Sequence, residues 1–221
     1  MNTPAAYVLA ITGASGAVYA VRLFDVLVAS GCRVHLVISP AGEAVLRTEL
    51  GLEADSTAAW ASVLLPQAGT AAADRLAGLI GPPVLAGPPA EGQVVCHDYR
   101  DLLAPIASGS WPTAGMVVCP CSGGTLAAVA GGTSDNLIHR AADVHLKERR
   151  RLVLVPRETP LSLVHLENMR RCLRAGAVVL PAAPGWYHGV RGVPDLVNFV
   201  VARICDQLGV PHHLMRRWGE A

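Results

Sequence analysis

The alternation of short apolar runs with helical segments is the feature that most limits what this chain can fold into. Residues 7–12 (YVLAIT) and 33–38 (RVHLVI) are rich in strand-forming residues, and residues 17–29 between them show helical spacing. Ser39 and Pro40 then suit the start of a second helix that runs to about residue 50. A chain that begins strand, helix, strand, helix predicts a parallel sheet with right-handed crossovers.

The same alternation returns in the second half of the chain. Strands are expected at 114–119, 152–155 and 177–180, and helices at 125–130, 135–149 and 193–208. A further helix is expected to start at Pro160, with Thr159 as its cap, and to end before Gly176. No internal repeat or second core is evident, so we expect one doubly wound α/β domain over residues 1–221, with helices on both faces.

Residues 51–97 interrupt this order. The segment is rich in Ala, Gly and Pro, as in GPPVLAGPPAEG. One short helix is expected around residues 71–79 and loop elsewhere. Because so long a loop is unusual inside a compact domain, the segment is interpreted as a surface insertion.

Composition excludes several classes of function. A net charge of +1 gives no general attraction to nucleic acid or to a membrane surface. No apolar run approaches the roughly 20 residues that span a bilayer, and the amino terminus has no signal-peptide pattern, so a cytoplasmic protein is expected. The six cysteines form no C-x-x-C pair and the histidines show no metal-ligand spacing, so no metal site is expected.

Polar loops are expected to follow successive strands. The loop Thr12-Gly13-Ala14-Ser15-Gly16 comes after the first strand and opens a helix, which suits an anion, although a tight turn without a ligand explains it as well. The loop lacks the full G-x-G-x-x-G pattern of a dinucleotide site. Ser39, Ser122 and the Ser108-Gly109-Ser110 turn are each either helix caps or parts of one shared polar crevice.

Charged side chains near the expected strand ends suggest phosphate recognition. Arg140 and Lys147 are seven residues apart and share one helix face, and Arg157 follows the next strand. The alternative is a solvated helix face with ion pairs to Asp143 and Glu148.

Two glutamates are candidate acid–base groups. Glu49 and Glu158 would serve in that way if they are buried beside a ligand, whereas most glutamates are simply exposed.

Five long stretches together resemble the flavin prenyltransferase (UbiX-type) family. They are ITGASGAVYAVRL at 11–23, APIASGSW at 104–111, GMVVCPCSGGTLAAVAGG at 115–132, SDNLIHRAADVHLKERRRLVLVPRETPLSLVHLENM at 134–169 and LPAAPGWYH at 180–188. The end of the chain, ARICDQLGV…RWGE at 202–220, also fits. The resemblance covers nearly all of the chain except 51–97. It implies a flavodoxin-like (Rossmann-like) sheet and a large homo-oligomer, a dodecamer, with sites between subunits.

The resemblance also implies an activity. Members of this family move the dimethylallyl group of dimethylallyl phosphate onto N5 and C6 of reduced flavin mononucleotide (FMN), without a metal ion. The product, prenylated FMN, serves a UbiD-type decarboxylase, often in ubiquinone biosynthesis.

The family's site residues are carried over onto the matching positions of this chain. The flavin contacts fall on Gly13, Ala14, Ser15, Ser39, Ala107, Ser108, Gly109, Ser110, Ser122 and Arg140, with Ser15 near N5. The prenyl-phosphate contacts fall on Lys147, Arg157, Tyr187 and Arg203. The catalytic set falls on Ser15, Glu49, Glu158 and Trp218, the last in a tail (209–221) that closes over the site.

Two departures and two alternatives accompany this interpretation. Leu102 stands where some relatives have a tryptophan, and 51–97 is longer than usual. One alternative is an FMN-dependent cysteine decarboxylase, but the P-x-S-A-N-T-like loop that it needs is replaced by PCSGGT at 120–125, and no Met-rich clamp is evident. The other is a non-catalytic flavin-binding subunit, which would not need a second phosphate pocket.

Overall fold

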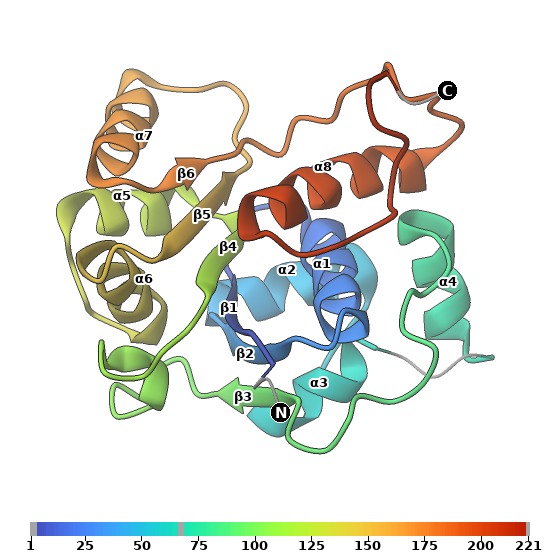
Figure 1. Ribbon diagram of the computed structural model, residues 1–221, viewed down its shortest axis with the longest axis horizontal. Helices are drawn as coiled ribbons and strands as arrows, with labels where there is room; N and C mark the ends of the chain where they lie inside the picture. The colour runs from blue at the N-terminus through green and yellow to red at the C-terminus, as the bar shows by residue number, and fades with distance from the viewer. Residues whose placement is uncertain (1–3, 66–68, 220–221) are drawn as a thin grey trace.

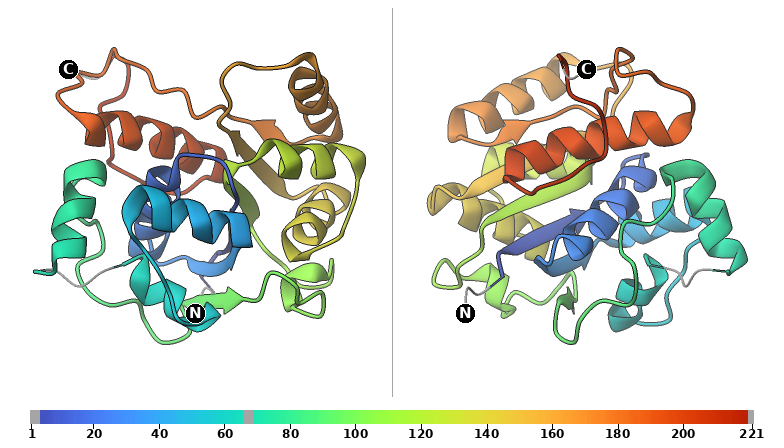
Figure 2. Two further views of the ribbon diagram at one scale, coloured as in Figure 1. Left: turned by 180° about the vertical axis from the view of Figure 1, so that it is seen from behind. Right: turned by 45° about the vertical axis from the view of Figure 1, so that its right-hand side comes forward.

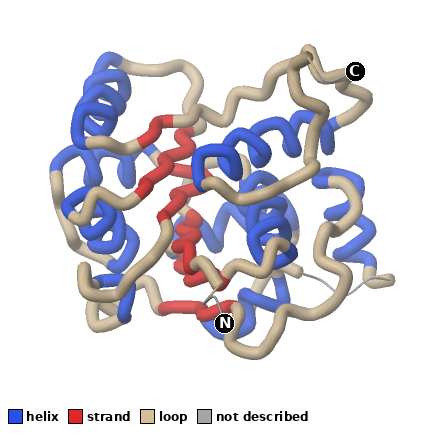
Figure 3. The backbone as a smooth tube through the Cα atoms, viewed as in Figure 1, coloured by secondary structure: helices blue, strands red, loops and turns tan. Residues whose placement is uncertain are grey.

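The computed structural model describes residues 4–65 and 69–219, and six parallel strands run through its centre (Figure 1; Figure 3). Their order across the sheet is β3-β2-β1-β4-β5-β6, and every neighbouring pair is parallel. The strands are β1 (Ala6–Ile11), β2 (Arg33–Ile38), β3 (Val94–His97), β4 (Gly115–Cys121), β5 (Arg151–Pro156) and β6 (Val178–Val179). The expected doubly wound sheet is therefore confirmed.

Eight helices surround this sheet in the described residues. They are α1 (Ala17–Ala29), α2 (Pro40–Leu50), α3 (Trp60–Val63), α4 (Ala71–Ile80), α5 (Gly123–Gly131), α6 (Leu137–Lys147), α7 (Leu163–Ala175) and α8 (Val193–Leu208). Short 3₁₀ turns lie at Thr57–Ala59 and Pro105–Ala107. Figure 1 shows α5, α6 and α7 on one side of the sheet, with α1, α4 and α8 on the other. Helices α1 and α8 lie side by side (Figure 2).

The strands supply two separate apolar cores because successive side chains point to opposite faces. In β1, Leu9 and Ile11 pack toward α1 and α8, whereas Val8 and Ala10 pack toward α5 and α6, and all four are fully buried. The central strands are buried on both faces, which explains why their sequences read as unbroken apolar runs.

The strand order places a topological switch point between β1 and β4. From β1 the chain first builds outward through β2 and β3, and it then crosses to β4 and builds the other way. Without β3, the remaining five strands have the flavodoxin order. In doubly wound sheets, ligands bind at the carboxyl ends of the strands beside such a point. The loops after β1 and β4 are therefore where a site is expected.

The segment 51–97 contains more regular structure than its sequence indicates. The helix expected at 71–79 is α4, but the expectation of loop elsewhere is wrong, because β3 and α3 also form here. Trp60, Leu64, Leu76 and Ile80 are buried in the core beside α1. These contacts bring apolar surface of an Ala-, Gly- and Pro-rich segment out of water, and tertiary packing thereby overrides its weak local preferences. That the segment is an insertion relative to other proteins stays a prediction.

Helix α7 starts later than the sequence predicts. Ser162, and not Thr159, is its cap: the Ser162 hydroxyl accepts a hydrogen bond from the His165 N–H (3.2 Å), and His165 Nδ1 accepts one from the Ser162 N–H (3.3 Å). This reciprocal pair satisfies two backbone donors at once, which a cap at Thr159 would not do.

Candidate functional site

The loops that follow β1 and β4 are tied together by one buried side chain, Thr12. Its hydroxyl donates to the carbonyl of Pro120 (2.7 Å) and accepts from the N–H of Ser122 (2.9 Å). The Thr12 N–H also donates to the Pro120 carbonyl (3.3 Å). Sequence reasoning did not single out Thr12. The signal available was a hydroxyl residue placed directly between a buried strand and a glycine.

The loop between Thr12 and α1 presents free backbone donors. Gly13 and Ser15 are exposed, and their N–H groups donate no hydrogen bond within the described residues. A side chain at Gly13 would lie 2.5 Å from the Ala41 Cβ, so only glycine lets α2 approach this closely. Free amides at the positive end of a helix suit an anionic or carbonyl-rich ligand, so the loop fits the flavin contacts predicted for Gly13, Ala14 and Ser15.

Glu49 lies against the start of the same helix. Its carboxylate accepts hydrogen bonds from the N–H groups of Gly16 (3.0 Å) and Ala17 (2.8 Å). Helix α1 has no cap from its own sequence, because Gly16 has a positive φ of 117° and no side chain. Glu49, from the end of α2, therefore caps α1 across the fold. This contact holds its carboxylate beside the Ser15 loop, and its predicted acid–base role stays a prediction.

Ser39 and Ser122 are both helix caps. The Ser39 hydroxyl accepts from the Gly42 N–H (3.0 Å) at the start of α2, and the Ser122 hydroxyl accepts from the Thr125 N–H (3.2 Å) at the start of α5. The cap interpretation that the sequence left open is thus the one observed. The Ser39 N–H also donates to the carbonyl of Ile11 (3.0 Å), and the Ser122 N–H donates to the Thr12 hydroxyl. Both serines are therefore held at the carboxyl edge beside the β1 loop.

Arg157 and Glu158 reach this edge from the end of β5. Arg157 Nε donates to the carbonyl of Ser15 (3.3 Å). Glu158 Oε2 would lie 4.0 Å from a Cβ placed on Gly123, at the start of α5. The fold therefore brings together one predicted prenyl-phosphate residue, the predicted acid–base glutamates and the predicted flavin loops.

The Ala107–Ser110 turn is held by arginines. Arg140 Nε donates to the Ala107 carbonyl (3.0 Å), and Arg150, which sequence reasoning missed, donates to the carbonyls of Gly109 and Trp111. The Ser108 and Ser110 hydroxyls are 2.8 Å apart and exposed. Arg140 thus contacts the Ala107–Ser110 turn, and the family resemblance predicts flavin contacts for both.

Arg140 and Lys147 also form the ion pairs that the sequence offered as an alternative. Arg140 pairs with Asp143 at 2.9 Å, and Lys147 forms a short ion pair with Glu148 beside Gly109. Both pairs are at least one-third exposed, so each contributes little to stability.

Tyr187 and Trp218 meet near the end of the chain. Their ring centroids are 5.3 Å apart with the planes at 84°, and Tyr187 makes a similar edge contact with Phe199 of α8. Trp218 is 82% exposed. The structure thus places Trp218 of the tail against Tyr187, and its predicted closure over the site stays a prediction.

Arg203 lies on the exposed surface of α8. Its guanidinium pairs with Asp206, one turn further along the helix, at 2.7 Å. Within the described residues, no hydrogen bond or ion pair joins Arg203, Lys147, Arg157 and Tyr187 to one another. Lys147, Arg157 and Arg203 thus each contact a different acceptor, namely Glu148, the Ser15 carbonyl and Asp206.

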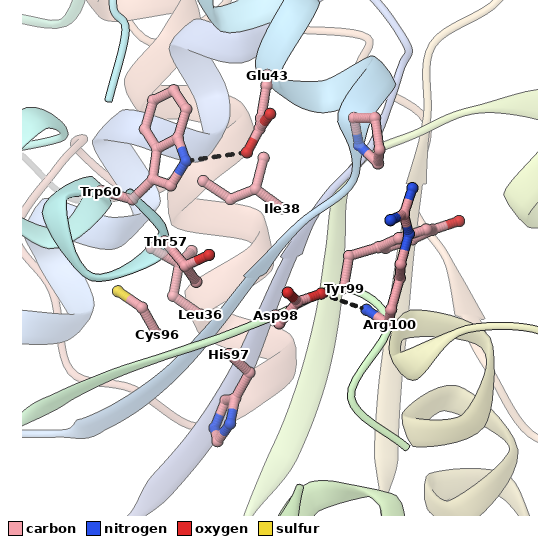
Figure 4. Close-up of a pocket in the computed structure, with 11 residues that line it drawn as sticks. Leu36, Ile38, Glu43, Thr57, Trp60, Cys96, His97, Asp98, Tyr99 and Arg100 are labelled. Carbon is pink, nitrogen blue, oxygen red and sulfur yellow. Dashed lines mark hydrogen bonds between the residues drawn. The ribbon is translucent and has the colours of Figure 1, made fainter. Parts of the chain in front are cut away.

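A cavity of about 160 Å³ opens between the ends of β2 and β3 and the start of α2 (Figure 4). Trp60 donates its indole N–H to Glu43 (3.1 Å) on one side of it. Asp98 and Arg100 lie on another side, where the Arg100 N–H donates to the Asp98 carboxylate (2.7 Å). Sequence reasoning predicted no site here. Leu102, the departure from the family pattern, lies in an exposed turn two residues after Arg100.

The cysteines and the charged groups give no sign of metal or thiol chemistry among the described residues. No group of three or more His, Cys, Asp or Glu side chains is placed to hold a metal ion there. All six cysteines are unpaired, and burial raises the pKa of the Cys119 and Cys121 thiols far above their usual value, which keeps them protonated. No helix in the described part of the chain is long and apolar enough to cross a membrane.

A doubly wound sheet with free loop amides at its switch point defines the class of nucleotide- and flavin-binding α/β proteins. The profile of the Flavoprotein family matches residues 1–205. The flavin prenyltransferase UbiX of Pseudomonas aeruginosa is 49% identical over 220 residues, which cover 100% of this chain and 97% of that protein. UbiX of Methanothermobacter thermautotrophicus is 41% identical over 211 residues, which cover 96% of this chain and 94% of that protein. The chain belongs to the flavin prenyltransferase UbiX family.

Solved structures agree with this assignment. AnUbiX (PadA1), in complex with FMN and dimethylallyl pyrophosphate, is 35% identical, with a TM-score of 0.77 over 99% of this chain and all of that one. A dodecameric FMN-dependent UbiX-like decarboxylase from Escherichia coli O157:H7 is 36% identical, with a TM-score of 0.74 over 97% of this chain and all of that one. The cysteine decarboxylase TvaF, at 15% identity and a TM-score of 0.52, shares the fold alone.

Proposed function

We propose that this chain transfers the dimethylallyl group of dimethylallyl phosphate to N5 and C6 of reduced FMN. The observation that carries the proposal is the meeting of the Ser15 loop, Ser122, Arg157 and Glu158 at the β1–β4 switch point. The cation and the carboxylate at the end of β5 support a second, phosphate-bearing ligand beside the flavin. The similar AnUbiX binds both FMN and dimethylallyl pyrophosphate, which supports the same pair of ligands here.

The residues at the switch point suit this chemistry. The free amides of Gly13 and Ser15 would hold the flavin edge, and Arg157 would lie beside the leaving phosphate. A phosphate that departs from an allylic carbon gains negative charge, so a nearby guanidinium stabilises the transition state more than the bound substrate. Formation of the second bond releases a proton from C6, which Glu158 would accept.

We further propose that the prenyl-phosphate pocket is completed by a second copy of the chain. Lys147, Tyr187 and Arg203 are all exposed, and within the described residues none of them shares a hydrogen-bond acceptor with Arg157. Large apolar side chains are exposed as well: Leu163 is 75%, Trp186 70% and Trp218 82% exposed. Exposed apolar surface of this kind marks an interface. The similar dodecameric protein supports a homo-oligomer, and we propose a dodecamer.

The site residues, the tail and the downstream partner remain parts of the proposal. Trp218 would close over the pocket from the 209–221 tail of a neighbouring copy. The product would pass to a UbiD-type decarboxylase, as the family resemblance implies. A cytoplasmic location is supported by six unpaired thiols, since a reducing compartment keeps thiols in this state.

The direct test is the mass of the flavin. Purified protein incubated with reduced FMN and dimethylallyl phosphate should yield a flavin heavier by one dimethylallyl group. Unchanged flavin would contradict the proposal, and oxidative decarboxylation of a cysteinyl peptide would favour the cysteine decarboxylase alternative.

The shared pocket has its own test. Arg157→Ala and Arg203→Ala should each be inactive alone, because each removes one cation from every site. If the two arginines of a site come from different copies, co-refolded mixtures contain sites with both arginines, and about a quarter of the parental activity should return. No recovery in mixed oligomers would show that both arginines act from the same copy.

A further inference from the structure

The last residues of the chain run back along α8 (Figure 1), and one carboxylate, that of Asp206, joins them to the helix. Asp206 Oδ2 accepts a hydrogen bond from Arg203 Nη1 (2.7 Å), one turn earlier on α8, and Oδ1 accepts one from Arg217 Nη2 (2.8 Å) in the tail. Arg217 Nη1 also donates to Oδ2 (3.3 Å), so this guanidinium binds both oxygens. His212 Nε2 lies 3.1 Å from Oδ1. One acid is therefore shared by two arginines and a histidine.

Asp206 is more sheltered from water than the arginines that it binds. Its side chain is 19% exposed, whereas those of Arg203 and Arg217 are 46% and 51% exposed. Burial alone would raise the pKa of Asp206, but the hydrogen bonds from Arg217 and His212 lower this pKa below its usual value, so the carboxylate is ionised. A sheltered and ionised acceptor of this kind restricts two side chains that would otherwise move freely in water.

The tail makes a second contact through the residue that follows Arg217. The ring centroid of Trp218 lies 5.3 Å from that of Tyr187, with the planes at 84°. The tail therefore contacts one predicted prenyl-phosphate residue, Tyr187, directly, and it reaches another, Arg203, through Asp206. These contacts make α8 and the tail one connected unit.

Arg203 keeps hydrogen-bond donors for a ligand while it is bound to Asp206. Its Nη1 donates to the carboxylate, and in the part of the chain that the structure describes its Nε and Nη2 donate no hydrogen bond. A guanidinium carries five N–H donors in one plane, so an acid at one nitrogen leaves the others available. A phosphate would then bind an arginine whose direction is already fixed, which reduces the side-chain entropy lost on binding.

We propose that Asp206 is a positioning residue that holds Arg203 and the Trp218 tail in one arrangement for the prenyl phosphate. This inference rests on the proposed function, in which Arg203 contacts that phosphate. Asp206 acts through the two arginines and does not touch the reacting atoms. Two cations around one anion leave the group with a net positive charge, so the carboxylate does not cancel the attraction for a phosphate.

The first test measures the binding of dimethylallyl phosphate to the full-length oligomer loaded with oxidised FMN, which does not accept the prenyl group. Asp206→Asn keeps the size of the side chain but replaces a charged oxygen with an NH₂ group, which cannot accept from a guanidinium. Calorimetry should show a Kd for dimethylallyl phosphate that is about ten-fold higher, because two arginines must then be ordered by the ligand itself. The FMN affinity should not change.

The transfer assay separates positioning from a loss of folding. In Asp206→Asn the KM for dimethylallyl phosphate should rise by a similar factor, while kcat at saturating donor should change little, because the bound phosphate orders Arg203. A loss of folded protein alone would lower kcat and leave both KM and Kd as in the parent protein.

The tail is followed by fluorine NMR of the protein labelled with 5-fluorotryptophan. The Trp218 signal is identified by its loss in Trp218→Phe. In Asp206→Asn this signal should move toward its position in the denatured chain, because the ring leaves Tyr187. Arg217→Gln should move it in the same way but raise the Kd for dimethylallyl phosphate less, since the pair between Arg203 and Asp206 remains. This readout needs no prenyl transfer.

Glu167→Gln is the matched control. Glu167 also pairs with an arginine three positions away, Arg170 on α7, at 2.8 Å. It should change neither the Kd nor the Trp218 signal, and an equal rise in Kd in this variant would overturn the inference.

An unchanged Kd in Asp206→Asn, in a protein whose parent prenylates FMN, would overturn the inference and leave the proposed function intact. An unmoved Trp218 signal in Asp206→Asn would also overturn it, because the tail would then be held without this carboxylate. If the parent protein leaves FMN unprenylated, the proposed function fails, and the Kd and the Trp218 signal still decide whether Asp206 holds the two arginines.

Discussion

The flavin loops and the prenyl-phosphate residues are organised in opposite ways. The flavin loops, at residues 12–17, 39–42 and 120–123, are joined by hydrogen bonds that cross the fold, from Thr12 to Pro120 and from Glu49 to Gly16. In the part of the chain that the structure describes, the predicted phosphate residues Lys147 and Arg203 are paired only with acids on or beside their own helices. The loops at the carboxyl edge are joined within a single chain, whereas the predicted phosphate residues are exposed side chains that, as we propose, another copy completes into a pocket.

The largest expected effect tests the surface half of this comparison. Arg203→Ala should slow prenyl transfer by about a hundred-fold or more, because a charge-assisted contact to the leaving phosphate is lost. FMN affinity and the free energy of unfolding should barely change, since Arg203 is exposed and its ion pair contributes little.

Arg170→Ala is a matched control for Arg203→Ala. Arg170 is also an exposed helical arginine paired with a carboxylate one turn away, and no role is predicted for it. Its transfer rate, measured at limiting prenyl donor, should equal that of the parent protein. A similar loss in both variants would place Arg203 outside the pocket.

A second prediction concerns the scaffold. Burial lowers the pKa of His35 and of His145 to about 4, and the same groups titrate near 6.5 in an unfolded chain. Between these values the unfolded chain binds more protons, so stability is complete above about pH 6.5 and falls as the pH drops toward 4. Each histidine should account for about 3 kcal/mol over this range.

Denaturant unfolding at several pH values tests this expectation. In His145→Gln the stability should depend less steeply on pH, since one of the two groups no longer titrates. FMN affinity per folded molecule should be unchanged at pH 6, because neither histidine lies in the flavin loops. An unaltered slope would show that His145 is not one of the groups responsible.

The rigid half of the site is tested by Thr12→Val. This change leaves the Ser122 N–H without its buried acceptor and removes one donor from the Pro120 carbonyl. We expect a loss of about 2 kcal/mol in the free energy of unfolding, together with weaker FMN binding. Chemical denaturation and a fluorescence titration with FMN check the two effects. A loss of stability with unchanged FMN affinity would mean that the loops are ordered without this clamp.

A smaller loss of stability than in Thr12→Val is expected for Glu49→Gln. The amide still accepts from the start of α1 but lacks the charge that the helix dipole favours, so the loss should be about 1 kcal/mol or less. Prenyl transfer should fall more than roughly ten-fold if Glu49 also handles a proton. A transfer rate equal to that of the parent protein would leave Glu49 as a helix cap alone.

The sequence by itself determined the sheet and the position of the polar loops at its carboxyl edge. Alternating apolar and helical patterns are local signals, and they predicted β1, β2, β4, α1, α2 and α8 within about two residues. The glycine- and serine-rich loops could be placed as well, because the carboxyl ends of parallel strands must share one edge. Ser39 and Ser122 follow strands, so their position needed no tertiary information.

Tertiary structure alone decided the contacts between distant segments. β3 forms only because β2 offers it an edge, since Val94–His97 is too short to signal a strand by itself. Glu49 caps α1 across 33 positions in the sequence, and Thr12 joins Ser122 across 110. The contact of Arg157 with the Ser15 carbonyl was equally invisible, because residue type and spacing report which side chains are present, whereas packing decides which of them meet.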